Sequence, residues 1–278
     1  MYCDFWNFTQ APFNQRLDLE YFFESELHEE ALARLLFVAE EQKKGAVFTG
    51  PSGTGKTLTL KVLQYLLKRS PHRCEYIDLL GLTEEEFLWQ VCAQLRLGPA
   101  HTTALPQLWR SLADYLTGLQ LTQSRVILLL DHVDKSHAEC LKSIERLLYS
   151  GNQQYPSLSI VTTFENLNSG QASNVSHLSD LAIELAPFDL EMTQNYIVHR
   201  LSQSGCSKSV FTDDAFEEIQ KTTAGTPQKI NQICDLALLA GYEQSLEHID
   251  SDVIKSANLE IKGAPTSTNR ISEVMQGV

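Results

Sequence analysis

The sequence predicts an α/β protein in which a parallel sheet, sandwiched by helices, is followed by a small all-helical domain. Two patterns predict this fold. Between residues 25 and 188, short apolar runs alternate with amphipathic segments of helical period, and such alternation is typical of a parallel sheet covered on both faces. After Phe188 the strand pattern stops, and four amphipathic segments follow one another.

Composition and charge narrow the class of protein. The 278 residues are 43% hydrophobic and 21% charged, which suits one large domain and one small one. A net charge of −13 disfavours nonspecific binding to nucleic acid or anionic membranes. No run approaches the ~18 apolar residues of a membrane span, no secretion signal is present, and the six cysteines form no CxxC pair. We therefore expect a cytoplasmic protein without a membrane span.

Residues 1–24 hold eight aromatic residues and show no clean period. Because aromatic side chains mostly serve burial, we expect an irregular arm that lies over the core, packing on it or covering an adenine base. An interaction surface is the alternative.

The segment 25–188 is expected to form the α/β core. Ser25 suits a helix N-cap, and residues 125–131 form a continuous apolar run, typical of a strand buried on both faces. The expected strands are 45–50, 74–79, 125–131, 158–164 and 181–188. The expected helices are 28–42, 56–69, 83–95, 104–119 and 137–149.

The segment 189–262 is expected to form the helical domain. Pro227 suits the first turn of a helix, where its missing N–H costs nothing. The expected helices are 191–205, 213–225, 227–242 and 250–261. Residues 263–278 are expected to form a disordered tail, since they begin with small and polar residues.

Residues 50–57 match the phosphate-binding pattern G-x-x-x-x-G-K-[ST], between an expected strand and an expected helix. Glycines let successive amides point at a phosphate, the lysine reaches the β- and γ-phosphates, and the threonine hydroxyl binds Mg²⁺. An accidental glycine-rich turn would lack this context. The expected nucleotide-binding residues are Gly50, Pro51, Ser52, Gly53, Thr54, Gly55, Lys56, Thr57 and Leu58.

Asp131 ends the buried apolar strand. Paired with a phosphate loop, a carboxylate at this position is expected to bind Mg²⁺ with Thr57, directly or through water. The sequence thus predicts ATP and Mg²⁺ as cofactors.

Phosphate loop, buried Asp strand and helical C-terminal block together resemble an AAA+ ATPase with its lid. More specifically, the opening MYCDFW…APF, the run FFESELHEEALARLLF (22–37), and the lid segments YIVHRLSQSG (196–205) and AGTPQKINQICDLALLAGY (224–242) resemble the general secretion pathway protein A (ExeA-like) family. The resemblance implies the cytoplasmic ATPase portion only, because larger members continue into a membrane span and a peptidoglycan-binding domain. Related ATPases serve secretion apparatus assembly, pilus biogenesis or transposition.

The sequence departs from the family pattern after Asp131. Where the family has the glutamate that activates water, this chain has His132, and losing a general base typically costs ~10²–10⁴ in rate. His132 is expected either to serve as a substitute base or to be a polar bystander or water-holding residue that does not catalyse. Asp134 is expected to be a substitute base or the N-cap of a helix starting near Ser136.

Further departures concern positive charge near the γ-phosphate. Residues 147–199 contain no Lys or Arg, and residues 165–180 are expected to form a loop of small and polar residues. The arginine finger of usual placement, worth ~10³–10⁵ in rate in other nucleotide hydrolases, is therefore missing. Arg146 or Arg125 would have to replace it. In the lid, the family's G-x-P-R motif ends here in Gln228, expected near the γ-phosphate. Thr162, Thr163 and Glu165 are the candidates for the polar residue that holds water after the fourth strand.

The favoured hypothesis is an ATP-dependent switch or assembly ATPase with weak hydrolysis. Its partner is expected to be a protein, in secretion or envelope machinery if the resemblance extends to function, and a homo-oligomer is compatible with the family. One alternative is a fully active ATPase that uses His132 or Asp134. The other is a DNA-associated, transposition-type regulator, which the acidic charge disfavours.

Overall fold

The computed structural model describes residues 2–14, 19–151, 157–166, 170–206 and 208–263. The chain divides into two compact units, residues 24–186 and residues 1–23 with 187–278. Below, the first is called the α/β unit and the second the helical unit. Of the predicted tail, all but Gly263 lies outside the described residues.

The α/β unit is built on a five-stranded parallel sheet in the order β2-β3-β4-β1-β5. This confirms the predicted fold class. Every residue of β1, β3 and β4 is buried, as expected for a parallel sheet covered on both faces. The strands are β1 (Gly45–Thr49), β2 (Arg73–Asp78), β3 (Val126–Asp131), β4 (Leu158–Phe164) and β5 (Leu181–Glu184).

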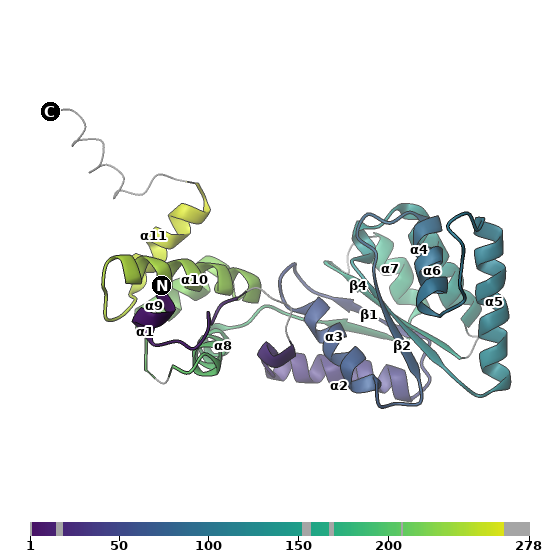
Figure 1. The fold of residues 1–278 in the computed structure, drawn as a ribbon, viewed down its shortest axis with the longest axis horizontal. Helices are drawn as coiled ribbons and strands as arrows, with labels where there is room; N and C mark the ends of the chain where they lie inside the picture. The colour runs from purple at the N-terminus through teal and green to yellow at the C-terminus, as the bar shows by residue number, and fades with distance from the viewer. Residues whose placement is uncertain (1, 15–18, 152–156, 167–169, 207, 264–278) are drawn as a thin grey trace. The chain divides into compact units, whose positions relative to one another are not determined.

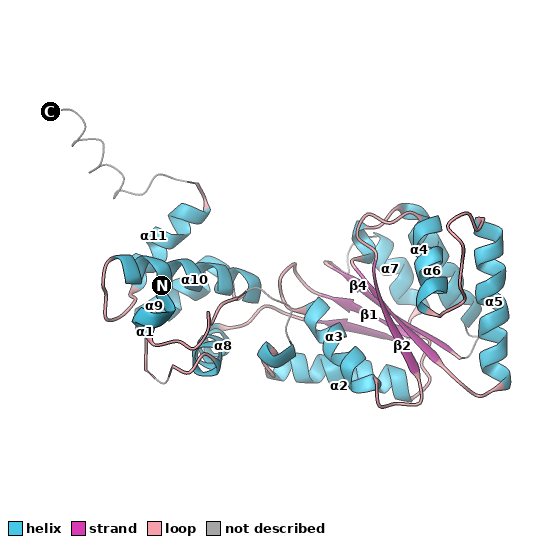
Figure 2. Cartoon of the chain, in the orientation of Figure 1, coloured by secondary structure: helices cyan, strands magenta, loops and turns pink. Residues whose placement is uncertain are grey.

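Helices cover both faces of the sheet (Figures 1 and 2). Because successive strand residues point to opposite faces, Ala46 and Phe48 pack with α2 and α3, whereas Val47 packs in the cluster on the other face. One face carries α2 (Glu26–Glu40) and α3 (Lys56–Leu67). The other carries α4 (Glu84–Gln94), α5 (Leu105–Leu121), α6 (Ala138–Gly151) and α7 (Gly170–Leu178).

Local signals explain most helix starts, and two expectations were wrong. Ser25 caps α2 by accepting from the His28 amide, as predicted. Residues 165–180 were expected to be loop, but α7 forms there because Ala172 and Val175, one turn apart, are both fully buried. The fifth strand was expected to reach residue 188 but ends at Glu184, because its partner β1 ends at Thr49 and turns away.

The helical unit contains α8 (Leu190–Gln203), α9 (Asp213–Thr223), α10 (Pro227–Glu243) and α11 (Ser251–Ile261). The last three pack on one another, and α8 packs on α9 and α10. Pro227 opens α10, as predicted. Gly225, just before it, has a φ of 69°, and a Cβ there would lie 1.8 Å from the Phe188 carbonyl oxygen, so only glycine fits at this approach.

The N-terminal segment packs on the helices of this second unit. We expected an irregular arm over the α/β core. Instead the segment begins with the short helix α1 (Tyr2–Trp6), the Trp6 indole donates to the Leu238 carbonyl (3.0 Å), and the Arg200 guanidinium donates to the Pro12 carbonyl (2.6 Å). Sequence could not foresee this partner because the aromatic spacing has no period that identifies a face.

Candidate nucleotide-binding site

The phosphate loop connects the end of β1 to the start of α3. Gly50, Gly53 and Gly55 have φ values of 154°, 82° and 107°. Residues other than glycine rarely adopt such positive φ angles. A Cβ on Gly50 would lie 2.4 Å from the Leu185 carbonyl oxygen, so the loop also needs glycine for close backbone approach. Since α3 begins at Lys56, its free amides and positive dipole end face the loop, as an anion site requires.

Lys56 lies inside the loop rather than on its surface. Its side chain is 8% exposed, and its Nζ donates to the Gly50 carbonyl (2.5 Å) and the Pro51 carbonyl (3.0 Å). Burial lowers the pKa of Lys56, and the carboxylates of Asp131, Glu165 and Asp134 oppose that shift. The amine is therefore held among three negative groups, close to where the loop would bind a phosphate.

His28 of α2 contacts the phosphate loop, a role that the sequence did not predict. Its Nε2 lies 3.1 Å from the Thr54 carbonyl oxygen and its Nδ1 2.7 Å from the Ser25 hydroxyl. Burial lowers the pKa of His28 to about 4, so the ring is neutral near pH 7. A Cβ on Gly55 would lie 2.8 Å from this ring, which adds a packing reason for the third glycine.

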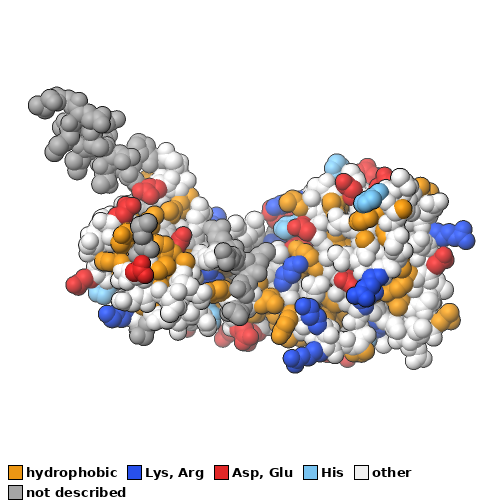
Figure 3. Space-filling model, viewed as in Figure 1, with side chains coloured by type: hydrophobic (Ala, Val, Ile, Leu, Met, Phe, Trp, Pro, Cys, Tyr) orange, Lys and Arg blue, Asp and Glu red, His pale blue; other side chains and the backbone are white. Residues whose placement is uncertain are grey.

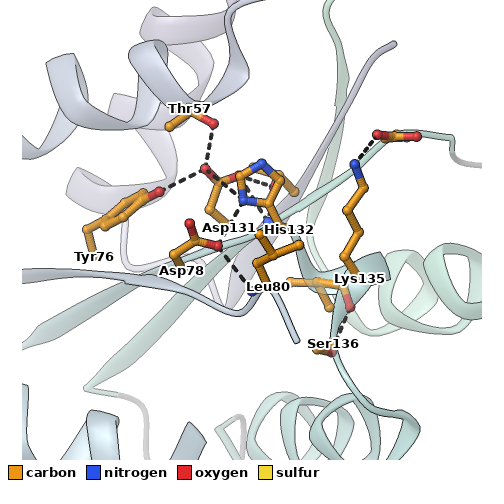
Figure 4. Close-up of polar contacts among 11 residues, drawn as sticks. Thr57, Tyr76, Asp78, Leu80, Asp131, His132, Lys135 and Ser136 are labelled. Carbon is orange, nitrogen blue, oxygen red and sulfur yellow. Dashed lines mark hydrogen bonds and ion pairs between the residues drawn. The ribbon is translucent and has the colours of Figure 1, made fainter. Parts of the chain in front are cut away.

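Asp131, at the end of β3, is the centre of the polar network in Figure 4 and is fully buried. Its Oδ2 accepts from the Thr57 hydroxyl (2.6 Å), and its Oδ1 accepts from the Thr163 hydroxyl. Burial alone would raise the pKa of Asp131, but the hydrogen bonds from Thr163 and Thr57 outweigh it and the pKa lies below its ordinary value. The two predicted metal-binding residues, Thr57 and Asp131, are thus adjacent, and the carboxylate is ionised.

Tyr76 and Asp78 of β2 also reach this network, and the sequence reading missed both. The Tyr76 hydroxyl donates to Asp131 Oδ2 (2.9 Å), and the Lys61 amine lies 3.1 Å from the centre of the Tyr76 ring. Asp78 is paired in register with Asp131. The sequence offers one signal, that the two residues are two apart and hence on one face of a strand, but only the folded sheet shows that this strand lies beside β3.

His132 has a left-handed backbone, with φ 52° and ψ 42°, which is uncommon for a residue other than glycine. Its amide donates to Asp131 Oδ1 (3.0 Å) and to the Thr163 hydroxyl (2.9 Å). Its ring turns to β2, where Nδ1 lies 2.9 Å from Asp78 Oδ1 (Figure 4). The ring is thus held by a carboxylate, and its role as a base stays a prediction.

Asp134 lies in a short 3₁₀ turn (Val133–Lys135) after His132. Its proposed role as a helix N-cap was wrong, because α6 begins only at Ala138 and the Asp134 carboxylate accepts from the Glu165 amide (2.9 Å). This bond ties the turn to the end of β4. Whether Asp134 acts as a base stays a prediction.

The three candidates at the end of β4 have different neighbours. Thr163 contacts both Asp131 and the His132 amide. The Thr162 hydroxyl instead donates to the Ala46 carbonyl of β1 (3.4 Å), and the Glu165 carboxylate pairs with Lys135 (2.5 Å). Thr163 is therefore the candidate that lies beside the predicted metal-binding carboxylate.

The two arginines considered as replacements for the finger contact other groups of their own chain, and a role for either in a neighbouring copy stays a prediction. Arg125 precedes β3, at the opposite end of the strand from Asp131, and its buried guanidinium donates to the Ala39 carbonyl and the Ser159 hydroxyl. The Arg146 guanidinium lies 4.1 Å from the centre of the Trp109 ring. Gln228 is exposed in the first turn of α10 in the helical unit, and its role at the γ-phosphate stays a prediction.

The sequence resembles a known family model and a known protein. Residues 39–163 match a family model described as "AAA domain". The chain is 28% identical over 271 residues to general secretion pathway protein A of Aeromonas hydrophila, covering 95% of this chain and 49% of the relative. It therefore spans about half the length of that relative.

Solved structures share the fold at low sequence identity. Cdc6p from Pyrobaculum aerophilum has a TM-score of 0.64 at 18% identity, over 84% of this chain and 68% of that one. Drosophila ORC bound to DNA has a TM-score of 0.66 at 18% identity, over 88% and 62%. These structures show the fold alone, whereas the AAA domain match and the 28% identity to general secretion pathway protein A agree with the family resemblance found in the sequence.

Proposed function

We propose that the chain is an ATP-dependent switch that binds Mg·ATP between the phosphate loop and Asp131 and hydrolyses it slowly. One observation carries the proposal: Lys56 and Asp131 are buried and the Thr57 hydroxyl donates to Asp131, whereas the residue after Asp131 is a histidine held by Asp78. Binding elements are complete and hydrolytic elements are not.

The residues present suit the triphosphate and its metal. Three glycines at positive φ free the loop amides for phosphate oxygens, and the Thr57 hydroxyl and Asp131 carboxylate offer the oxygen ligands that Mg²⁺ prefers. Bound Mg²⁺ neutralises charge on phosphate oxygens. Within this chain, Lys56 would bind the β- and γ-phosphates while Tyr76 and Thr163 hold the Asp131 carboxylate in place.

A second candidate is a true ATPase with His132 as the base, and the Asp78–His132 contact favours it. If Nδ1 donates its proton to Asp78, Nε2 is left as an acceptor, which is the arrangement of a carboxylate-oriented histidine base. Against it stands the missing positive charge between residues 147 and 199, because a finger from a neighbouring copy contributes ~10³–10⁵ in rate.

The partner is proposed from the relative's name. General secretion pathway protein A suggests a role in assembling secretion or envelope machinery, in the cytoplasm, with self-association as an open feature of that role. Among the described residues, no helix is both long and apolar enough to cross a bilayer. A DNA-associated role is disfavoured by the net charge of −13, and on the face drawn in Figure 3 basic side chains are interspersed with acidic and apolar ones.

The test measures ATP affinity and phosphate release together in the wild type, Asp131→Asn and His132→Ala. The proposal expects Mg-dependent ATP binding that Asp131→Asn weakens, slow phosphate release, and no change of either quantity in His132→Ala. Sustained turnover in the wild type that falls by ~10²-fold or more in His132→Ala would contradict the switch and favour an ATPase with His132 as its base. A wild type that binds no ATP would contradict both hypotheses.

A further inference from the structure

A cation that the sequence reading did not use lies beside the phosphate loop. Lys135, in the turn after β3, forms an ion pair with Glu165, just after β4, with 2.5 Å between Nζ and Oε1. Both side chains are partly exposed, at 39% and 41%. The pair raises the pKa of Lys135 and lowers the pKa of Glu165, so both groups are charged near pH 7.

The pair is linked to the loop from both of its members. Besides Lys135, the charge of Lys56 and the Ser52 side chain in the loop also lower the pKa of the Glu165 carboxylate. The pKa of Lys56, lowered mainly by burial, is lowered further by the positive charge of Lys135. Lys135 is thus close enough to the loop lysine for their charges to interact.

The backbone of Lys135 is held by two hydrogen bonds, and its side chain is partly exposed. Its amide donates to the His132 carbonyl and its carbonyl accepts from the Gly81 amide, both at 3.0 Å. Its long side chain extends away from this turn (Figure 4), and its amine pairs with the Glu165 carboxylate. Exposed ion pairs of this kind are weak and exchange readily for another anion.

We propose that Lys135 is a ligand for the γ-phosphate supplied by this chain itself, and that Glu165 holds it until a nucleoside triphosphate arrives. The inference rests on the proposed function, since it requires a nucleotide in the phosphate loop. A diphosphate leaves the Lys135–Glu165 pair intact, because it brings no third phosphate. A triphosphate brings a new anion, which attracts Lys135 and repels Glu165.

The alternative is an ion pair that only ties the turn to β4. That role would make the protein less stable when either residue is changed, but would affect diphosphate and triphosphate binding alike. The two roles therefore differ in nucleotide discrimination.

The experiment measures dissociation constants for Mg·ADP and for a non-hydrolysable Mg·ATP analogue by titration calorimetry. It uses the wild type, Lys135→Met, Glu165→Gln and the double variant, with Lys142→Met on an exposed position of α6 as matched control. In Lys135→Met the preference for the triphosphate should fall ~10-fold, the size of one charged hydrogen bond, with the ADP constant unchanged. Glu165→Gln should tighten the triphosphate and leave ADP unchanged, and this gain should vanish in the double variant.

The outcomes separate this inference from the function it rests on. Suppose that the wild type binds both nucleotides and that Lys135→Met changes both dissociation constants equally or not at all. That result would overturn the γ-phosphate role of Lys135 but would not contradict the proposed switch. A wild type that binds neither nucleotide would overturn the switch and this inference together. Thermal unfolding of each variant shows whether a lost affinity comes from a lost fold.

Discussion

The two sides of the nucleotide site are built differently. On the loop side, Lys56 and Asp131 are 8% and 0% exposed. On the other side, the pairs His132–Asp78 and Lys135–Glu165 join side chains that are 32% to 46% exposed. The loop side thus belongs to the packed core of the α/β unit, and the other side consists of exchangeable surface pairs.

This difference indicates which residues of the site can be substituted without disturbing the fold. A residue of the loop side is tied to glycine geometry, helix start and sheet register at once, so its replacement disturbs packing as well as binding. A residue of the exposed side is held by one ion pair. We therefore expect a change at an exposed position such as His132 to leave the loop side intact.

The largest effect should come from the buried loop lysine. In Lys56→Ala, ATP affinity should fall roughly 10²-fold or more, because charged hydrogen bonds to two phosphates are lost. A fluorescent-nucleotide titration measures it, with Lys68→Ala at the exposed C-terminal end of α3 as control. An unchanged ATP affinity in Lys56→Ala would show that the loop side does not bind the nucleotide through Lys56.

Two neighbouring threonines on β4 test whether a hydroxyl that bonds to Asp131 matters for metal binding. Thr163→Val removes a hydroxyl that donates to Asp131, whereas Thr162→Val removes one that donates only to Ala46. The Mg²⁺ concentration for half-maximal ATP binding should rise ~10-fold in Thr163→Val, the usual effect of losing a group that orients a metal ligand. Thr162→Val should change it less than Thr163→Val does. Equal effects would mean that Thr163 does not position Asp131.

His28 should make the loop side sensitive to acid. Its pKa is about 4 when folded against 6.5 when unfolded, so the unfolded chain binds more protons between these values and stability falls as pH decreases from 6.5 towards 4. The loss from this residue should be about 2 kcal/mol between pH 7 and pH 5. Denaturant unfolding of His28→Gln at both pH values should show a smaller loss than the wild type. His177→Gln, at an exposed histidine, is the control. Equal losses of stability between pH 7 and pH 5 in His28→Gln and the wild type would contradict a neutral, buried His28 ring.

The smallest effect should come from the exposed side. His132→Ala removes a ring held by Asp78 but leaves the amide that bonds to Asp131. ATP affinity should therefore stay within a factor of about 2, since no buried group loses its partner. Calorimetry at saturating Mg²⁺ decides this, and a tenfold loss would place His132 among the binding residues.

Much of this arrangement could be read from the sequence. The strand ending in Asp131 follows from a continuous apolar run, and the loop from glycines placed before a lysine and a threonine. Tyr76 and Asp78 could not be assigned, because their role depends on β2 lying beside β3. Strand order is a property of the folded sheet that no local pattern carries.

Other features escaped for different reasons. α7 has few apolar residues, and we attribute its helical form to tertiary packing, since Ala172 and Val175 are fully buried. Lys135 and Glu165 are 30 positions apart and meet only because the ends of β3 and β4 are neighbours. Contacts across the sheet are thus the part of the site that sequence alone leaves open.

The most direct test of the central claim is a single turnover of ATP labelled at the γ-phosphate, with protein in excess. If the chain is a binding switch, nearly all label should be bound and remain as ATP, and His132→Ala should release phosphate at the same slow rate as the wild type. Rapid conversion of bound ATP in the wild type, with ATP retained in His132→Ala, would contradict the switch and make His132 the base of an active ATPase.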